Sequence, residues 1–250
     1  MDFSAFPPLA AILDAAHAGL LALAGLLEPF AGSAAAALAI VLVTLAVRAA
    51  LIPLGVLQVR AEVSRRRLAP KIAELQKRFR KNPETLQRKT LALYQENGVS
   101  PFAGMLPALA QIPIVSVLYG VAVSTQLNGH PNELLSEDLF GAPLGQSLTA
   151  LLSHPTLAVL VPIVLLLVMA VVAWFTRRQT LRMSAAIPVA EGALAGVAGI
   201  LSWLSFTTVL IAAFVPLAAA LYLAVSTTWT YVERTILRAR AGVFDTAAAG

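Results

Sequence analysis

The sequence predicts an all-α, polytopic membrane protein with a core of five transmembrane helices and an antiparallel helical hairpin in the cytoplasm. Hydrophobic residues make up 58% of the 250 positions and charged residues only 12%, about half the share of roughly 25% that is usual for soluble domains. Arg and Lys are also concentrated in alternate connections between long apolar runs. This combination argues against an ordinary water-soluble enzyme.

The composition also excludes several kinds of site. The chain has no cysteine, which rules out a disulfide scaffold, a thiolate metal site and a cysteine nucleophile. The three histidines, His17, His130 and His154, are scattered along the chain and give little support to a metal centre. We therefore expect neither a metal nor a cofactor.

Apolar runs of about 20 residues, long enough to cross a hydrocarbon core of about 30 Å, set the predicted boundaries. The predicted spans are 34–59, 100–123, 156–176, 189–207 and 208–232. The remaining segments are an N-terminal segment at 1–33, a hairpin at 60–99, an outer loop at 124–155, a cytoplasmic loop at 177–188 and a cytoplasmic tail at 233–250.

The distribution of basic residues predicts the orientation of these spans. Of the 18 Lys and Arg residues, 11 lie between Arg60 and Lys89, three lie in 177–182 and three lie in 234–240. The segments 1–33 and 124–155 contain none. Because cytoplasmic loops carry the excess of basic residues, we expect the N-terminus outside and the C-terminus in the cytoplasm.

The apolar stretch at 9–27 allows two interpretations. Asp14, His17 and Glu28 fall on one helical stripe, and prolines bracket the run. We interpret it as an amphipathic helix lying on the outer surface, and a sixth span is the alternative. The N-terminus lacks the basic residues that begin a Sec-type signal peptide, so we expect no cleaved signal.

The segment 60–99 has the pattern of two helices separated by a short turn. Asn82 suits a helix cap, Pro83 suits the first helical position and Gly98 suits a stop. Each arm has one narrow apolar seam, typical of an antiparallel coiled coil. The seam residues are Leu68, Ile72, Leu75 and Phe79 on the first arm, and Leu86, Thr90 and Leu93 on the second.

The other faces of this hairpin carry eleven basic and four acidic residues, a net charge of +7. Such a surface suits a docking platform for a negatively charged or amphipathic partner. A solvated linker that rests on anionic lipid headgroups is the alternative.

Arg48 lies inside the first predicted span. At a helical rise of about 1.5 Å per residue, its place in the span puts it near the middle of the bilayer. A guanidinium there costs roughly 2.5–3.5 kcal/mol on insertion scales, so it must face protein or water. It could pair with Glu191, the single carboxylate in the predicted spans, or line a hydrated cavity and stay available to an anionic partner, which we favour. Thr44 lies one turn away and extends this polar patch, and Pro53 predicts a kink.

Further polar side chains occur at membrane depth. Singly, such residues usually bridge helices, but their number beside an arginine favours a wet interior groove. They are Gln111, Ser116, Tyr119, Ser202, Ser226, Thr227, Thr228 and Trp229.

Several segments, in this order, resemble the YidC/Oxa/Alb family of membrane-protein insertases, in its short, single-domain bacterial form. The resemblance covers about residues 34–235 and is strongest from Thr44 to Tyr119. The segments are Thr44–Arg48 with Pro53, Leu68–Lys77, Leu91–Pro101, Leu106–Pro113 and, at the end, Pro216–Thr230.

The resemblance implies a groove that is open to cytoplasm and lipid and closed outside. By position in the motifs, the groove residues are Arg48, Thr44, Gln111 and Trp229, and the surface along which an inserting segment slides comprises Ile112, Val115 and Ile211. The family often has aromatic or methionine side chains on that surface and an amide in the third helix, which this chain lacks. It also lacks a long basic tail after Glu233.

The predicted function is therefore that of a non-enzymatic insertase and chaperone for nascent membrane proteins, a multi-pass protein of a bacterial cell membrane. The resemblance implies nascent chains as substrates, with the ribosome and the Sec translocon as further partners of the hairpin, and a functional monomer. The basic charge of the hairpin predicts contact with anionic lipids. No cofactor is needed.

Two other classes of protein fit less well. A small anion transporter or channel would use Arg48 as its binding group, but that class usually has internal repeats, and none is visible. An intramembrane serine protease would need a base beside a membrane serine, whereas all three histidines lie outside the predicted spans.

Overall fold

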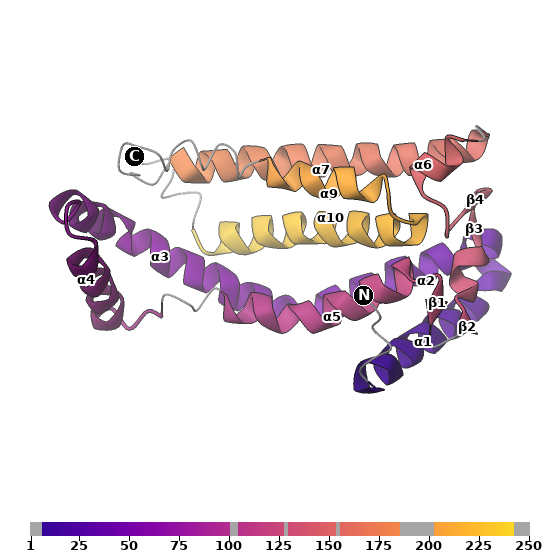
Figure 1. Ribbon diagram of the computed structural model, residues 1–250, viewed down its shortest axis with the longest axis horizontal. Helices are drawn as coiled ribbons and strands as arrows, with labels where there is room; N and C mark the ends of the chain where they lie inside the picture. The colour runs from indigo at the N-terminus through magenta and orange to yellow at the C-terminus, as the bar shows by residue number, and fades with distance from the viewer. Residues whose placement is uncertain (1–6, 101–104, 128–129, 154–155, 186–202, 243–250) are drawn as a thin grey trace. The chain divides into compact units, whose positions relative to one another are not determined.

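The computed structural model describes residues 7–100, 105–127, 130–153, 156–185 and 203–242, and these are mostly helical (Figure 1). The main helices are α1 (Pro7–Ala31), α2 (Ala35–Ala50), α3 (Ile52–Arg78), α4 (Pro83–Glu96), α5 (Leu106–Val123), α7 (Leu160–Ala185), α9 (Leu204–Ala212) and α10 (Leu217–Arg240). Short helices are η2 (Gly32–Ala34), η3 (Glu133–Ser136), α6 (Leu148–Leu151) and η4 (Leu157–Val159).

The chain forms two compact units. The first unit comprises Met1–Ala50, Ile112–Ala173 and Phe206–Thr230. The second unit comprises Leu51–Gln111, Trp174–Ser205 and Tyr231–Gly250.

Two stretches of the described residues are long and apolar enough to cross a membrane, judged by length and composition. They are Ala11–Ala50, of 40 residues, and Leu157–Met183, of 27 residues. Gln111–Val123 is a shorter apolar helix. The predicted fourth span, 189–207, lies mostly outside the described residues.

The first unit begins with two packed helices, α1 and α2. Gly32 has a φ of 53° in the turn η2, a left-handed conformation that glycine adopts without steric cost. This turn lets α1 pack against α2. The predicted helix at 9–27 is thus part of a longer helix, and Leu13 and Leu20 form its buried face.

The core of the first unit is rich in small side chains. Ala39 and Ala218 are completely buried, and alanines make up much of the buried surface of α2 and α10. Small residues let helix backbones approach closely. The larger buried members of the same cluster include Leu13, Ile40, Val121, Leu134, Leu144, Leu217 and Tyr222.

The predicted outer loop, 124–155, is more ordered than a plain connection. It contains two antiparallel ladders, β1 (Gln126–Leu127) with β2 (His130–Pro131) and β3 (Asp138–Leu139) with β4 (Ala142–Pro143). Phe140 and Gly141 join the second pair with φ values of 52° and 78°, the positive angles of a tight hairpin turn. The all-α prediction missed these short strands because two-residue strands leave no periodic signal.

Asn132 fastens this loop to the end of α5. Its side chain is 5% exposed, donates to the carbonyls of Val121 (2.7 Å) and Ser124 (2.9 Å), and accepts from the Leu134 amide. The loop also reaches α10, where the amides of Leu217 and Ala218 donate to loop carbonyls. These bonds satisfy helix-end groups that would otherwise lack partners.

Two helix breaks differ from the predicted boundaries. The predicted span 34–59 is divided at Leu51, where α2 ends and α3 begins with Pro53 in its first turn, so the expected kink is a break. The predicted boundary between 207 and 208 falls inside α9, and the chain turns at 213–216 instead. Pro216 lacks a backbone donor and directly precedes α10.

The second unit contains the predicted hairpin. Its first arm is the continuous helix α3, and its second arm is α4, capped by Asn82 through the amide of Thr85 (3.0 Å). Gly98 follows α4 with a φ of 63°. The predicted cap, turn and stop are confirmed. The predicted loop at 177–188 begins as helix, because α7 continues to Ala185 through residues that include no Gly or Pro.

Candidate functional site

Arg48 lies in the last turn of α2, where a cation interacts favourably with the negative end of the helix dipole. Its side chain is half-buried. Nε donates to the hydroxyl of Ser226 on α10 at 3.0 Å, and Nη2 donates to the same hydroxyl. Both residues belong to the first unit. The guanidinium is thus held by a neutral oxygen.

Ser226 itself is 3% exposed, and its carbonyl accepts from the hydroxyl of Thr230 (2.8 Å). Within the described ranges, no carboxylate forms an ion pair with Arg48. Glu191, the carboxylate considered from the sequence, lies outside the described residues. A hydroxyl is a neutral acceptor, so it orients the guanidinium without neutralising its charge.

Thr44 lies one turn before Arg48 and is 1% exposed. Its hydroxyl donates to the Ile40 carbonyl of its own helix at 2.7 Å, a local bond typical of threonine within a helix. It lines a cavity of about 10 Å³ together with Leu20, Ile40, Val43, Leu118, Ala122, Leu134 and Tyr222. The surroundings of Thr44 are therefore mostly apolar, and its hydroxyl is already bonded.

The other two predicted groove residues lie in different units. Trp229 is on α10, three residues after Ser226, and is half-buried. Residues three apart on a helix share a face, so Trp229 neighbours the partner of Arg48. Gln111 belongs to the second unit and is half-buried.

The three residues of the predicted sliding surface lie in the first unit. Ile112 is 55% exposed and Ile211 is 46% exposed, whereas Val115 packs against the core. Ile211 was expected on the last helix but lies on α9, before the break at 213–216. Exposed aliphatic side chains at 112 and 211 suit contact with lipid or with an apolar segment.

Ser226 is the site residue that the sequence did not single out. It was one of eight polar side chains at membrane depth, and nothing in the sequence pairs it with Arg48. The signal that could have identified Ser226 was its place three residues before Trp229, a predicted groove residue on the same helix.

Comparisons with known proteins agree with this picture. The family model described as 60Kd inner membrane protein matches residues 26–242. The chain is 41% identical over 104 residues to the membrane protein insertase YidC of Clostridium perfringens (strain 13 / Type A), which covers 41% of this chain and 44% of that protein. It is 36% identical over 93 residues to the membrane protein insertase MisCA of Bacillus subtilis (strain 168), covering 36% of each.

A plant relative matches a similar length. The chloroplastic inner membrane protein ALBINO3 of Arabidopsis thaliana is 39% identical over 105 residues, which is 42% of this chain and 22% of that protein. The aligned part thus spans less than half of each of these three relatives. The family match nevertheless covers most of the chain, so the resemblance seen in the motifs is confirmed: this is a membrane protein that belongs to the 60Kd inner membrane protein family, the YidC/Oxa/Alb family.

Proposed function

We propose that this protein inserts nascent membrane proteins into the bilayer and assists their folding. The observation that carries this proposal is the half-buried guanidinium of Arg48, which is bound by the Ser226 hydroxyl and, within the described part of the chain, by no carboxylate. Membership of the family and the printed names of the relatives support it.

The physical basis is the cost of moving polar groups into hydrocarbon. An unpaired peptide or carboxylate group in a bilayer loses the solvation that water provides. An arginine with an uncompensated charge replaces part of that solvation for an acidic translocated tail, through a Coulomb attraction that strengthens as water is excluded. Apolar side chains of the client then partition into lipid past exposed residues such as Ile112 and Ile211.

The topology proposed for this activity has five crossings, with the N-terminus outside and the C-terminus in the cytoplasm of a bacterial cell membrane. The absence of Lys and Arg from 1–33 and 124–155 supports it. In this arrangement α1 lies on the outer surface. The exposed basic side chains of the hairpin face anionic lipids, a ribosome or the Sec translocon, and the protein works as a monomer.

Insertion by purified protein in liposomes tests this proposal. Two single-span clients that differ only in an acidic or a neutralised N-terminal tail are compared for Arg48→Ala, Arg48→Lys and the unmodified chain. We expect Arg48→Ala to lose insertion of the acidic client selectively, and Arg48→Lys to retain part of it because the charge remains.

Arg182→Ala is the matched control, since Arg182 is an exposed arginine at the end of α7. Undiminished insertion of the acidic client by Arg48→Ala would refute the role given to this arginine. Uptake of small anions without any client insertion would instead favour a transporter.

A further inference from the structure

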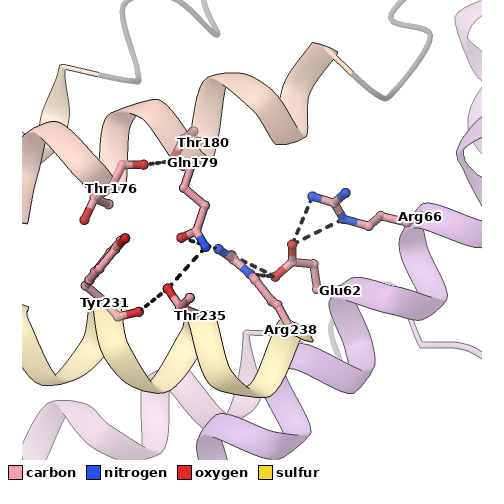
Figure 2. A network of polar contacts seen from close by, with 8 residues as sticks. All are labelled: Glu62, Arg66, Thr176, Gln179, Thr180, Tyr231, Thr235 and Arg238. Atoms are coloured by element: carbon pink, nitrogen blue, oxygen red, sulfur yellow. Dashed lines mark hydrogen bonds and ion pairs between the residues drawn. The ribbon is translucent and has the colours of Figure 1, made fainter. Parts of the chain in front are cut away.

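A second polar cluster lies in the second unit, where α3, α7 and α10 meet (Figure 2). Glu62 on α3 accepts from Arg238 on α10 through Nε (3.1 Å) and Nη2 (2.9 Å), both to the same carboxylate oxygen. Its other oxygen accepts from Nε and Nη2 of Arg66, one turn along α3, at 3.3 and 3.2 Å. Both oxygens of Glu62 are therefore engaged by guanidinium groups.

The third helix joins through Gln179 of α7. Its side-chain carbonyl accepts from Nη1 of Arg238 at 3.1 Å, and its amide donates to the hydroxyl of Thr235 at 3.3 Å. Figure 2 shows Arg238 between Glu62 and Gln179. One arginine thus uses all three guanidinium nitrogens to connect two other helices to α10.

The cluster is sheltered from water. The side chain of Arg238 is 12% exposed and that of Glu62 is 28% exposed. Ion pairs at fully exposed positions contribute little, whereas charge-assisted, forked contacts with partial burial are stronger and more directional.

Side chains of α10 also pack against the backbone of α3 at Gly55. A Cβ at Gly55 of α3 would lie 2.0 Å from Oε1 of Glu233 and 3.6 Å from Cδ1 of Leu237, both on α10. On α7, the ring of Phe175 lies 6.1 Å from that of Tyr231 on α10. Contacts on both sides of α10 therefore place the cluster within a packed junction.

Glu62 lies near the base of the hairpin, with a long part of α3 beyond it. Helix α3 is continuous to Arg78, so about 24 Å of helix extends beyond Glu62 at 1.5 Å per residue. This extension carries exposed basic residues of the hairpin, and the second arm, α4, follows its end. A change of angle at its base therefore moves the far end of the hairpin.

We infer that Glu62 is a positioning residue, which through Arg238 and Gln179 holds the base of the hairpin against α7 and α10 and so directs the basic arm toward the incoming chain. Docking of the hairpin is a property of the structure alone. Only the effect on the incoming chain rests on the proposed insertase function.

Distances between spin labels test the docking. The chain has no cysteine, so cysteines placed at the exposed positions Lys77 and Arg182 label uniquely. For full-length protein in lipid nanodiscs, we expect a narrow distance distribution. We expect Glu62→Gln to raise the undocked population about tenfold, the factor that corresponds to about 1.4 kcal/mol.

Glu74→Gln is the matched control, because Glu74 is an exposed glutamate on the same arm and should leave the distribution narrow. Arg238→Lys keeps the charge but loses the fork, and should give an intermediate distribution, which keeps the test usable should Glu62→Gln misfold. The reversed pair Glu62→Arg with Arg238→Glu, made together with Arg66→Gln, should restore docking, since the Gln179 amide can turn to donate to a carboxylate.

Restoration by the reversed pair supports a specific docking contact. An unchanged distribution in Glu62→Gln, or equal broadening in Glu74→Gln, overturns it. Insertion assays on the same variants separate the two proposals. Loss of docking with slower insertion of acidic and neutral clients alike supports the positioning role, and loss of docking with normal insertion overturns that role while leaving the Arg48 test unaffected.

Discussion

Arg48 on α2 and Ser226 on α10 lie 178 positions apart in the sequence, yet two guanidinium nitrogens donate to the one serine hydroxyl. The pair joins two helices of the first unit, and Ser226, the partner of the arginine, is polar but uncharged. Among the residues that the structure describes, the guanidinium is therefore oriented by a neutral hydroxyl.

Replacement of Ser226 by aspartate should convert this contact into a permanent ion pair. Because the arginine charge would then be compensated in place, we expect insertion of a client with an acidic tail to fall about tenfold or more. Ser226→Asn, of similar size but neutral, is the control and should retain most insertion. Equal activity of the aspartate and asparagine variants would contradict the need for a free charge.

Replacement of Asn132 by leucine should destabilise the first unit. The change removes three hydrogen bonds at a 5% exposed position, and buried groups left without partners cost about 1–3 kcal/mol each. We expect a clearly lower midpoint of thermal unfolding in detergent. Asn97→Leu is the comparison, because Asn97 is exposed and makes its side-chain bond to Leu93 in water; similar losses for both variants would argue against the role of Asn132.

Gly145→Ala should be destabilising because the added methyl group would meet backbone. Its Cβ would lie 2.8 Å from the Leu135 carbonyl oxygen, and such overpacking costs about 1–3 kcal/mol. Gly19→Ala in α1 provides the contrast, since no atom lies within 4 Å of its new Cβ and alanine stabilises a helix by about 1 kcal/mol relative to glycine. Unfolding midpoints that move in the same direction would refute this prediction.

Phe140→Asn should stabilise the turn between β3 and β4. Phe140 has a φ of 52° and is 76% exposed, so the native residue bears backbone strain with little packing in return. Asparagine followed by glycine is favoured in such turns, and we expect a gain of about 1 kcal/mol. A lower unfolding midpoint in detergent would mean that the phenyl ring makes a stabilising contact of its own.

The helical class and the hairpin were predictable because each rests on local signals. Asn82, Pro83 and Gly98 act on their own backbone, and the structure places a cap, a turn and a stop at these residues. The family was predictable from short motifs for the same reason. Helix ends in the rest of the chain were harder to predict, since apolarity indicates which residues tolerate lipid and not where a helix stops. Helix α7, for example, continues to Ala185, beyond the predicted end of its span at 176.

The candidate site was predictable in its charge but not in its partner. Arg48 was conspicuous as a single cation within an apolar run, which is a property of its neighbours in sequence. Ser226 is its partner because α2 and α10 come together in the fold. Nothing in the sequence distinguishes this serine from the others as the one that makes the contact. The glutamate–arginine junction of α3, α7 and α10 escaped for the same reason, because Glu62 and Arg238 are 176 positions apart.

The alanine-rich faces of α2 and α10 also limit how this end of the first unit can respond to change. Methyl side chains have no rotamers, so buried alanines such as Ala39 and Ala218 cannot adjust to strain by changing side-chain conformation. A disturbance there is taken up by the larger side chains of the same cluster or by displacement of the two helices that carry Arg48 and Ser226.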